Sequence, residues 1–330
     1  MTVPVRLWPV YLAAPKNFIV RFDAVPRRDP DLVPEAIVLV ACVRDEMIRI
    51  NQFLDHYRRI GVDHFVIVDN ASADGTAEWL EQQPDVSLYR TSQSFAEAGC
   101  GWAWVETLLE RHAAGRWCLV ADADELLVYP GYPDLGLRDV IAYHEANGFT
   151  AMASLMLDMY AATLCPPKDA VGSLFDLCPY YDSGGIRVAC RVLLDRAQDR
   201  LVGGFRQRVL GTRVILNKVA LFHNRPGVRL SLSNHAILGA RCSDLRAVHL
   251  HFKYLADFRE RVADEMARGE HWNGASEYRS YAQALDELEK ADGRRDVLSS
   301  GSRRWAGTQS LIDCGIMRSS ARFERFFSRG

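Results

Sequence analysis

The sequence lacks several features that would identify its class directly. None of its eight cysteines forms a Cys-x-x-Cys pair and they are scattered, which argues against a zinc cluster or a disulfide framework and favours reduced thiols in a cytoplasmic protein. Pro9 interrupts the short apolar stretch near the start, so we expect no secretory signal. Uncharged runs such as Ala146–Leu157 are far shorter than the roughly 20 apolar residues of a membrane-spanning helix.

Lysine is scarce as well, because only five of the 40 basic residues are lysines and the rest are arginines. Codon bias accounts for most of this excess, although arginine also binds phosphate groups through two parallel hydrogen bonds. The formal net charge of −2 argues against a broad nucleic-acid-binding surface. With 48% hydrophobic and 25% charged residues, the 330-residue chain has the composition of a globular protein with a sizeable core.

Two nucleotide-binding motifs are also missing, the dinucleotide motif Gly-x-Gly-x-x-Gly and the Gly-Lys-Ser/Thr phosphate loop. What the chain does contain is a regular alternation of strand and helix patterns between residues 36 and 150, which predicts a parallel sheet covered by helices. Six prolines predict an irregular lead-in at 1–35, a mixed α+β part follows at 151–254, and 255–330 is predicted to be a helical extension. The expected strands are 36–43, 64–68, 86–89 and 117–121, and the expected helices are 46–60, 76–83, 95–112, 255–268 and 275–291.

The most informative motif is Asp122-Ala123-Asp124-Glu125, which directly follows the expected strand 117–121. Ligands of parallel sheets bind beyond the carboxyl ends of the strands, so this position favours a binding site. If strand alternation continues, Asp122 and Asp124 share one side and Glu125 points the opposite way. Paired carboxylates repel each other unless a cation is near, and their oxygens suit Mg²⁺ or Mn²⁺, which in turn hold a diphosphate. A helix cap or a solvated turn is the alternative role for so short a pattern.

Polar loops follow the first two strands and are expected beside this motif in a wound sheet. The first loop begins with Arg44-Asp45-Glu46, and the second begins with Asp69-Asn70. The carboxylate and amide groups of the second loop are able to bind a ribose or a base edge. Ordinary turn chemistry is the alternative for both loops.

Two segments resemble a known family, namely VACVRDEMIRINQFLDHYRRIGVDHFVIVDNASADGT and WCLVADADELLVYP. They are similar to the GT-A glycosyltransferases of family 2, and most of all to its bacterial branch with a DxDE motif. The resemblance is strong over 36–130 and weaker towards the segment around His271. It implies an α/β fold of GT-A type, in which helices flank a mostly parallel sheet that is wound as in the Rossmann fold. It also implies a helical C-terminal extension. It also implies a nucleotide-sugar-binding half at 36–150 and an acceptor-side half at 151–254.

The resemblance further implies roles for single residues. Asp69 matches the acidic residue that contacts the donor nucleoside, and Asp124 matches the direct metal ligand, with Asp122 nearer the ribose. His251 matches a histidine late in the family's sequence that completes metal or diphosphate binding. His249 has the same strand parity, so the sequence does not decide which of the two histidines has this role. The expected ion is Mn²⁺ or Mg²⁺. The residues expected to line the nucleotide-sugar pocket are Val43, Arg44, Glu46, Asp69, Asn70 and Asp122. The cations expected at the leaving diphosphate are Arg187, Lys218 and Lys253. For each of these three cations, a surface salt bridge is the alternative role.

The catalytic base is not recognisable from the resemblance. An inverting transfer needs a group that takes the proton of the acceptor hydroxyl, and the acidic pair that supplies it elsewhere in the family is not evident here. Asp158, Asp176 and Asp182 are candidates by position, and Asp182 is the weakly favoured one. Whether the transfer inverts or retains the anomeric configuration therefore stays open.

These features predict a metal-dependent glycosyltransferase of the hexosyl or a related kind. It would move a sugar from a nucleoside-diphosphate donor to a hydroxyl of a glycan or lipid-linked acceptor, in surface polysaccharide synthesis. One alternative is a sugar-nucleotide nucleotidyltransferase, but such enzymes usually carry a Gly-rich loop after the first strand and this chain does not. The other alternative is a catalytically inactive nucleotide- or glycan-binding module of the same fold.

The end of the chain is rich in arginine and carries four aromatic residues, Trp305, Phe323, Phe326 and Phe327. We expect a C-terminal helix that packs these aromatics on the core. The alternative is contact with an anionic membrane, where a lipid-linked acceptor would lie, at the inner face of the membrane.

Overall fold

The structure is a computed structural model that describes the chain except for residues 1–18, 27–29, 194–196, 232, 291–296 and 329–330. Its first half contains β1 (Val38–Val43), α1 (Ile50–Ile60), β2 (His64–Asp69), α2 (Thr76–Leu80), β3 (Val86–Arg90), α3 (Trp102–His112), β4 (Trp117–Val120), β5 (Glu125–Val128) and α4 (Leu137–Ala146). The middle contains β6 (Ala151–Asp158), α5 (Leu174–Leu177), β7 (Tyr180–Asp182), β8 (Arg187–Leu193), β9 (Ala197–Val202), α6 (Gly204–Leu210), β10 (Asn217–His223), β11 (Arg229–Ser231), the short helix η1 (Ser233–His235), β12 (Ala236–Leu238) and β13 (Cys242–His251). The last part contains α7 (Phe258–Arg268), α8 (Trp272–Lys290), β14 (Ser302–Arg304), α9 (Thr308–Asp313) and α10 (Ala321–Phe327).

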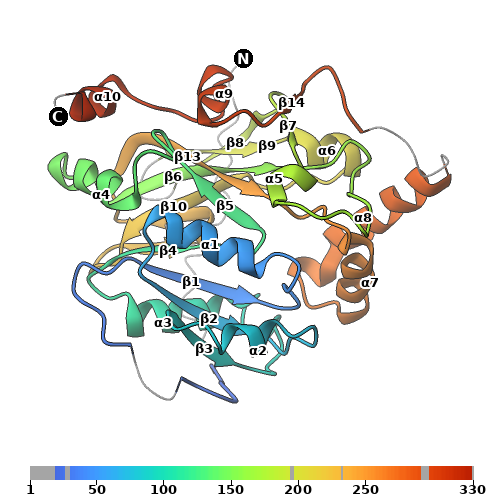
Figure 1. Cartoon of the computed structure of the whole chain (residues 1–330), viewed down its shortest axis with the longest axis horizontal. Coiled ribbons are helices and arrows are strands. Elements are labelled where there is room, and N and C mark those ends of the chain that lie inside the picture. The colour runs from blue at the N-terminus through green and yellow to red at the C-terminus, as the bar shows by residue number, and fades with distance from the viewer. Residues whose placement is uncertain (1–18, 27–29, 194–196, 232, 291–296, 329–330) are drawn as a thin grey trace.

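A central eight-stranded sheet organises these elements in the order β3-β2-β1-β4-β10-β6-β13-β5 (Figure 1). The pairs β3–β2, β2–β1, β1–β4 and β6–β13 are parallel, whereas β10 runs antiparallel to both of its neighbours and β5 runs antiparallel to β13. The carboxyl ends of β1, β2, β4, β6 and β13 therefore meet at one edge of the sheet. This mostly parallel, helix-flanked sheet confirms the predicted α/β fold class of Rossmann-like GT-A type.

Both faces of the sheet are covered, which explains why its strands are continuously apolar. In β1, alternate residues enter two different cores: Leu39 and Ala41 belong to the one that includes α1 and α4, while Val38 and Val40 belong to the one that includes α3. The helix α1 ends as its sequence predicts, because Gly61 adopts the left-handed conformation (φ 103°) and its N–H bonds back to the Arg58 carbonyl.

Several predicted boundaries shift in the structure: the helix expected at 46–60 begins at Ile50, the one at 76–83 ends at Leu80, and two further shifts come from turns in the backbone. The helix expected from residue 95 begins at Trp102, because Gly99, Cys100 and Gly101 all have positive φ and form a turn before it. The strand expected at 117–121 ends at Val120, and the backbone then turns, with the Glu125 N–H bonded to the Asp122 carbonyl. The shift at Val120 matters for the site.

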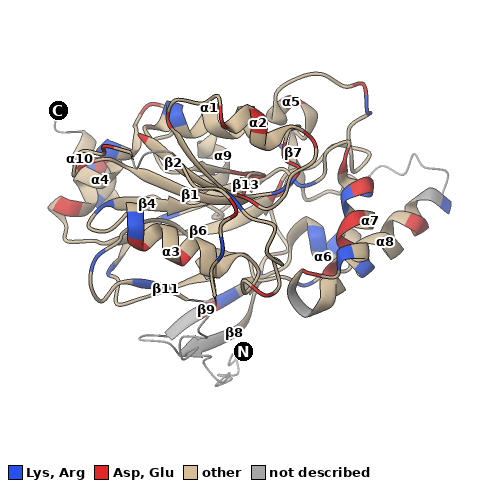
Figure 2. Ribbon diagram, turned by 90° about the horizontal axis from the view of Figure 1, so that it is seen from below, with Lys and Arg blue, Asp and Glu red and all other residues tan. Residues whose placement is uncertain are grey.

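A third core joins α6, α7 and α8 at one end of the sheet through Phe205, Tyr254, Phe258 and Tyr281. Basic and acidic residues are interspersed along α7 and α8 (Figure 2). Among the described residues, no helix has the length and apolar character that crossing a bilayer requires.

The C-terminal segment returns across the molecule to α4 (Figure 1). Phe323 is buried, with its ring centroid 5.0 Å from that of Tyr143 on α4, and Phe326 lies 5.5 Å from the same ring. The predicted packing of these aromatics on the core is therefore confirmed for α10. Part of Phe326 remains exposed.

Candidate functional site

The loops after β1 and β2 are locked together by side chains that bond to backbone N–H groups. The consecutive N–H groups of residues 45, 46 and 47 donate to Ser72 Oγ, Thr76 Oγ1 and Asp74 Oδ2, each at 2.9 Å. In return, the N–H of Ala73 donates to Asp45 Oδ1 at 2.6 Å. The sequence cluster that predicts a turn after β2 therefore also builds the loop after β1, and the two loops form one rigid edge.

The first loop is also tied to α7, which lies more than 200 residues away in sequence. Buried Glu46 accepts from Arg49 at 2.5 Å and from Arg261 at 2.9 Å. Arg49 binds both carboxylate oxygens of Asp257 at 2.8 Å, just before α7. Glu46, predicted from the sequence to line the nucleotide pocket, thus joins α7 to the sheet, and Val43 is buried at the end of β1.

Asp69 and Asn70 end β2 at the same edge. Asp69 is buried, its Oδ2 accepts from the Ser72 N–H at 3.2 Å, and its Oδ1 has no hydrogen-bond partner. Burial raises the pKa of this carboxyl group above its ordinary value, although the bonds to Ser72 oppose that shift. Asp69 lines a small pocket with residues of β3 and of the loops around it. An unpaired buried acceptor beside a pocket is a polar atom that a ligand donor can satisfy.

The neighbouring Asn70 and Arg44 hold other backbone in place. The Asn70 amide donates to the carbonyls of Thr91 and Gln93 at 3.1 and 3.0 Å. Arg44 donates to the Asn70 carbonyl at 2.8 Å. Both predicted pocket residues are therefore at this edge, where they fix the loops around Asp69.

The Asp122–Glu125 turn distributes its three carboxylates differently from the alternation expected of a strand. The side chain of Asp122 is 60% exposed, that of Asp124 is 9% exposed and that of Glu125 is 1% exposed. Asp122 and Glu125 contact the same lysine, whereas Asp124 contacts a histidine. The expectation that Glu125 points the opposite way from Asp122 is wrong, because the strand ends at Val120 and the turn after it brings both carboxylates to Lys218.

Asp124 belongs to the cluster of Asp124, His251, Asp158 and Arg206, called here the histidine cluster. The Phe252 N–H bonds to the Asp124 carbonyl at 2.7 Å and so fixes the turn against the end of β13. His251 Nε2 lies 3.2 Å from Asp124 Oδ2, and His251 Nδ1 lies 2.7 Å from Asp158 Oδ1. One imidazole therefore bridges a carboxylate of the turn after β4 and a carboxylate at the end of β6.

Arg206, from α6, completes the histidine cluster on its far side. It donates to Asp158 through Nη2 at 2.6 Å and through Nε at 3.3 Å, and both side chains are buried. Burial alone opposes ionisation of Asp158, but the Arg206 guanidinium outweighs it and holds the pKa of that carboxyl well below its usual range. Asp158 is thus a fixed anion behind the imidazole.

The cluster of Asp122, Glu125 and Lys218, called here the lysine cluster, lies beside it. Lys218 Nζ is 3.1 Å from Asp122 Oδ2 and 2.9 Å from Glu125 Oε1, and the lysine side chain is 5% exposed. Burial disfavours the charged lysine, yet the two carboxylates outweigh that cost and raise its pKa. Lys218, predicted as a cation for the diphosphate, is already paired with two anions.

The other predicted cations differ from Lys218. Lys253, two residues after His251, is half-buried, with its Nζ 3.4 Å from the Tyr278 hydroxyl and 5.3 Å from the ring centroid. It forms no ion pair within the described part of the chain. Arg187 is exposed at the start of β8, on a separate two-stranded hairpin. It makes no hydrogen bond or ion pair with the other predicted site residues among those that the structure describes.

The structure separates the two histidines that the sequence left together. His249 is fully buried one strand repeat below His251, and its Nδ1 lies 2.9 Å from Ser154 Oγ. Burial lowers the pKa of His249 to about 3. Of the two, His251 is the one that contacts the Asp-x-Asp motif.

The three base candidates have distinct surroundings. Asp158 is the buried partner of Arg206 and His251. Asp182 accepts from Arg208 at 2.8 and 2.9 Å and from the Tyr160 hydroxyl, so its oxygens are paired with donors. Asp176 is exposed and binds Ser173 at the first turn of α5, with no contact to the histidine or lysine cluster. None of the three is an unpaired carboxylate at the site.

The donor atoms of the histidine cluster suit a divalent ion. Ligands on adjacent corners of an octahedral ion with bonds of 2.0–2.1 Å lie about 3 Å apart, close to the separation of Asp124 Oδ2 and His251 Nε2. A carboxylate behind the other ring nitrogen is the usual support for a metal-bound histidine, and Asp158 occupies that position. Among the described residues, no three His, Cys, Asp or Glu side chains gather closely enough to hold an ion by themselves. Further ligands would have to come from solvent or substrate.

For several residues of the site, no motif or spacing in the sequence indicates a functional role. Arg206 lies 48 residues after Asp158 in the sequence, and only the fold brings the two residues together. Arg261 and Asp257 likewise reach the first loop across the whole domain. Arg49 is the exception, since its spacing of three residues from Glu46 on a predicted helix is an ion-pair signal.

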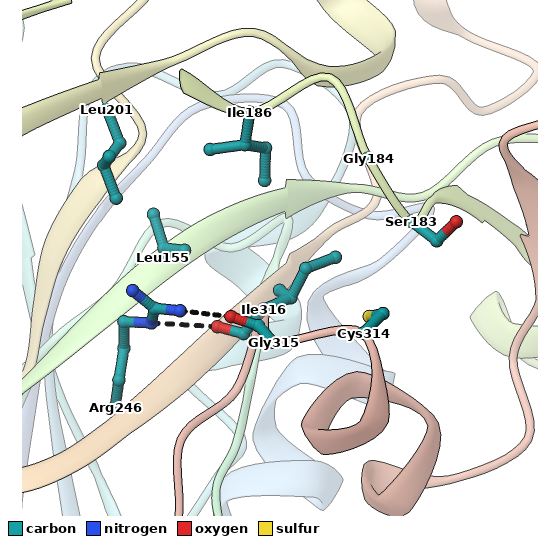
Figure 3. Close-up of a pocket in the computed structure, with 9 residues that line it drawn as sticks. All are labelled: Leu155, Ser183, Gly184, Ile186, Leu201, Arg246, Cys314, Gly315 and Ile316. Carbon is teal, nitrogen blue, oxygen red and sulfur yellow. Dashed lines mark hydrogen bonds between the residues drawn. The ribbon is translucent and has the colours of Figure 1, made fainter. Parts of the chain in front are cut away.

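A second cavity, of about 270 Å³, lies away from these clusters, between β6, the start of β8 and the turn after α9 (Figure 3). Leu155, Ile186, Leu201 and Ile316 give it apolar walls. Arg246 closes one side by donating to the carbonyls of Gly315 and Ile316. The C-terminal segment thus forms part of the cavity wall.

No family model and no curated protein matches the chain. Solved structures that it resembles include a 4-diphosphocytidyl-2C-methyl-D-erythritol synthase, at 18% identity and a TM-score of 0.26; the match covers 38% of this chain and only 61% of that one. A putative glucose-1-phosphate thymidylyltransferase from Bacillus anthracis is 10% identical, with a TM-score of 0.27 and coverage of 88% and 99%. An apo-UDP-glucose pyrophosphorylase is 9% identical, with a TM-score of 0.28 and coverage of 89% and 99%. By name, the last two belong to the nucleotidyltransferase class rather than to the glycosyltransferases, but TM-scores this low transfer no function.

Proposed function

We propose that the protein is a transferase that acts on a nucleotide sugar, and that glycosyl transfer is its reaction. The single observation that carries this proposal is the histidine cluster at the carboxyl edge of the sheet. Asp124 and His251 present an oxygen and a nitrogen 3.2 Å apart, backed by the ionised Asp158. Two such ligands with open positions suit an ion that also binds substrate phosphates.

In this proposal the divalent ion, Mn²⁺ or Mg²⁺, supplies charge neutralisation for the diphosphate leaving group. Asp124 and His251 hold it, Asp158 orients the imidazole, and Arg206 keeps Asp158 ionised. Lys253, which has no ion pair among the described residues, contributes a second positive charge to the departing diphosphate. The rigid edge formed by the first two loops positions the nucleoside without a loop rearrangement, which favours catalysis by alignment.

The nucleoside is proposed to bind at Asp69. Its unpaired Oδ1 accepts a hydrogen bond, so a base with a ring N–H is favoured over one that offers only a lone pair there. Uracil, thymine and guanine carry such an N–H, and cytosine does not. We therefore expect UDP, dTDP or GDP to bind more tightly than CDP.

A thermal-shift panel with purified full-length protein tests this function. Ligand at 100 times its dissociation constant stabilises by about 2.7 kcal/mol, enough to raise the melting temperature by several degrees. We expect such a rise with at least one of UDP, dTDP and GDP when Mn²⁺ is present, and a smaller rise without the ion. The variant Asp176→Asn is the control and should respond to the nucleotides like the wild type, because Asp176 is exposed and lies outside both clusters. If no nucleoside diphosphate stabilises the protein in a metal-dependent way, the proposal fails.

Nucleotidyl transfer, the alternative that the sequence left open, is the second candidate. A Gly-rich loop after the first strand usually binds the triphosphate in that class through backbone N–H groups. Here the N–H groups of residues 45, 46 and 47 are already bonded to side chains of the second loop. This favours glycosyl transfer.

The two reactions release different products. Slow release of a nucleoside diphosphate from a nucleotide sugar supports glycosyl transfer. Release of pyrophosphate from a nucleoside triphosphate and a hexose 1-phosphate would replace it with the second candidate.

A further inference from the structure

Lys218 is placed under the Asp122–Glu125 turn by the one antiparallel strand in the middle of the sheet. The strand β10 pairs with β4 so that Phe222 faces Cys118 and His223 faces Trp117. Lys218 lies four residues before Phe222 on β10, beyond a register shift between Val219 and Leu221, and so near the carboxyl end of β4. The ammonium then reaches Asp122 Oδ2 at 3.1 Å and Glu125 Oε1 at 2.9 Å.

The carboxylates of the turn differ in whether they are paired with the Lys218 ammonium. Asp122 and Glu125 share the Lys218 ammonium at ion-pair distance, whereas Asp124 contacts the imidazole of His251 and feels the charges of Lys253 and Arg49 only from beyond that distance. A cation already paired with two anions adds little attraction for a phosphate. A carboxylate held by an ammonium at 3.1 Å is, in turn, a poorer ligand for a second cation.

Resting on the proposed function, we propose that Lys218 is a positioning residue, a built-in counterion that keeps Asp122 out of the metal coordination sphere. The protein then binds a divalent ion through Asp124 and His251 alone. Affinity for the ion by itself is low, and the diphosphate of the donor supplies the missing ligands. Metal and nucleotide therefore bind cooperatively, and each leaves readily once the other has gone.

Titration of the full chain with Mn²⁺ alone, followed by electron paramagnetic resonance of the free ion, tests this role. In Lys218→Met the ammonium is replaced by an uncharged side chain of similar length, which frees Asp122 to bind the ion. We expect the dissociation constant for Mn²⁺ to fall by at least about fivefold, because a nearby positive charge has also been removed. Lys218→Arg keeps the charge and is expected to bind Mn²⁺ like the wild type.

Two further variants separate the role of Lys218 in Mn²⁺ binding from an effect on folding and from the loss of one positive charge. Lys218→Met leaves Glu125 buried without a cation, so Lys218→Met combined with Glu125→Gln removes both buried charges and is expected to show the same gain. Lys168→Met, at an exposed lysine paired with Glu260, is the matched control for loss of one positive charge.

A gain of affinity is a result that a merely structural lysine would not produce. Unchanged or weaker Mn²⁺ binding in both Lys218→Met variants overturns the proposal. The proposed function fails by a separate measurement, the absence of Mn²⁺-dependent stabilisation of the wild type by nucleoside diphosphates.

Discussion

The histidine cluster and the lysine cluster lie side by side on one turn, yet they handle negative charge in different ways. In the histidine cluster every member is buried, and Asp158, His251 and Arg206 are joined by contacts of 2.6–2.8 Å. In the lysine cluster one carboxylate, Asp122, is 60% exposed, and a single buried lysine is the counterion of both carboxylates. The comparison teaches that a short acidic motif need not act as a unit, because neighbouring carboxylates differ in partners and in exposure.

The largest effect that tests this comparison is expected from Arg206→Met. It leaves Asp158 in the interior without its guanidinium partner, and breaking a buried ion pair in this way costs about 3 to 5 kcal/mol. Urea unfolding followed by circular dichroism measures the loss. Arg187→Met, at an exposed arginine with no ion pair among the described residues, is the matched control and is expected to unfold like the wild type. A loss below about 1 kcal/mol would remove the distinction between a buried and a partly exposed cluster.

The next effect in size is expected from Asp124→Asn. Loss of a group that is hydrogen-bonded to a metal ligand typically lowers affinity for the metal by 10- to 100-fold. Loss of the ligand itself is therefore expected to weaken Mn²⁺ binding by at least about 100-fold. The nucleoside-diphosphate stabilisation that depends on Mn²⁺ should disappear as well. The same titration on Asp122→Asn supplies the contrast, because only Asp124 is assigned to the ion. Equal losses in the two variants would show that the motif binds metal as a pair after all.

The smallest effect is expected from Asp122→Asn on stability. Its ion pair with Lys218 is largely exposed on the aspartate side, and such pairs contribute about 1 kcal/mol or less. The free energy of unfolding should therefore change by less than that amount, again by urea unfolding. A loss as large as that of Arg206→Met would mean that Asp122 is a structural anchor of the turn.

The parallel part of the fold could be predicted from the sequence because its signals are local. Continuous apolar runs predict β1, β2 and β4, and Gly61 predicts the end of α1. The edge residues Asp69, Asp122 and Asp124 follow from those strands, since polar residues after parallel strands gather at one edge.

The pairing of the site residues could not be predicted, for two physical reasons. Alternation holds only within a strand, and the turn after Val120 sends Asp122 and Asp124 to different partners. Arg206, on α6, and Lys218, on β10, reach carboxylates that lie 48 and 96 residues earlier in the chain, and no local pattern encodes such contacts. The choice between His249 and His251 likewise depends on how far β13 extends past the turn.

The ties between the first loop and α7 have a consequence for the order of events during synthesis. Glu46 and Arg261 are 215 residues apart, so at 5–20 residues per second the loop waits roughly 10 to 40 seconds for its distant partner to emerge from the ribosome. Until then, Glu46 has only Arg49 as a counterion, and Arg49 lacks Asp257. The edge formed by the first two loops, built from the earliest strands, is therefore among the last parts of the nascent protein to be completed.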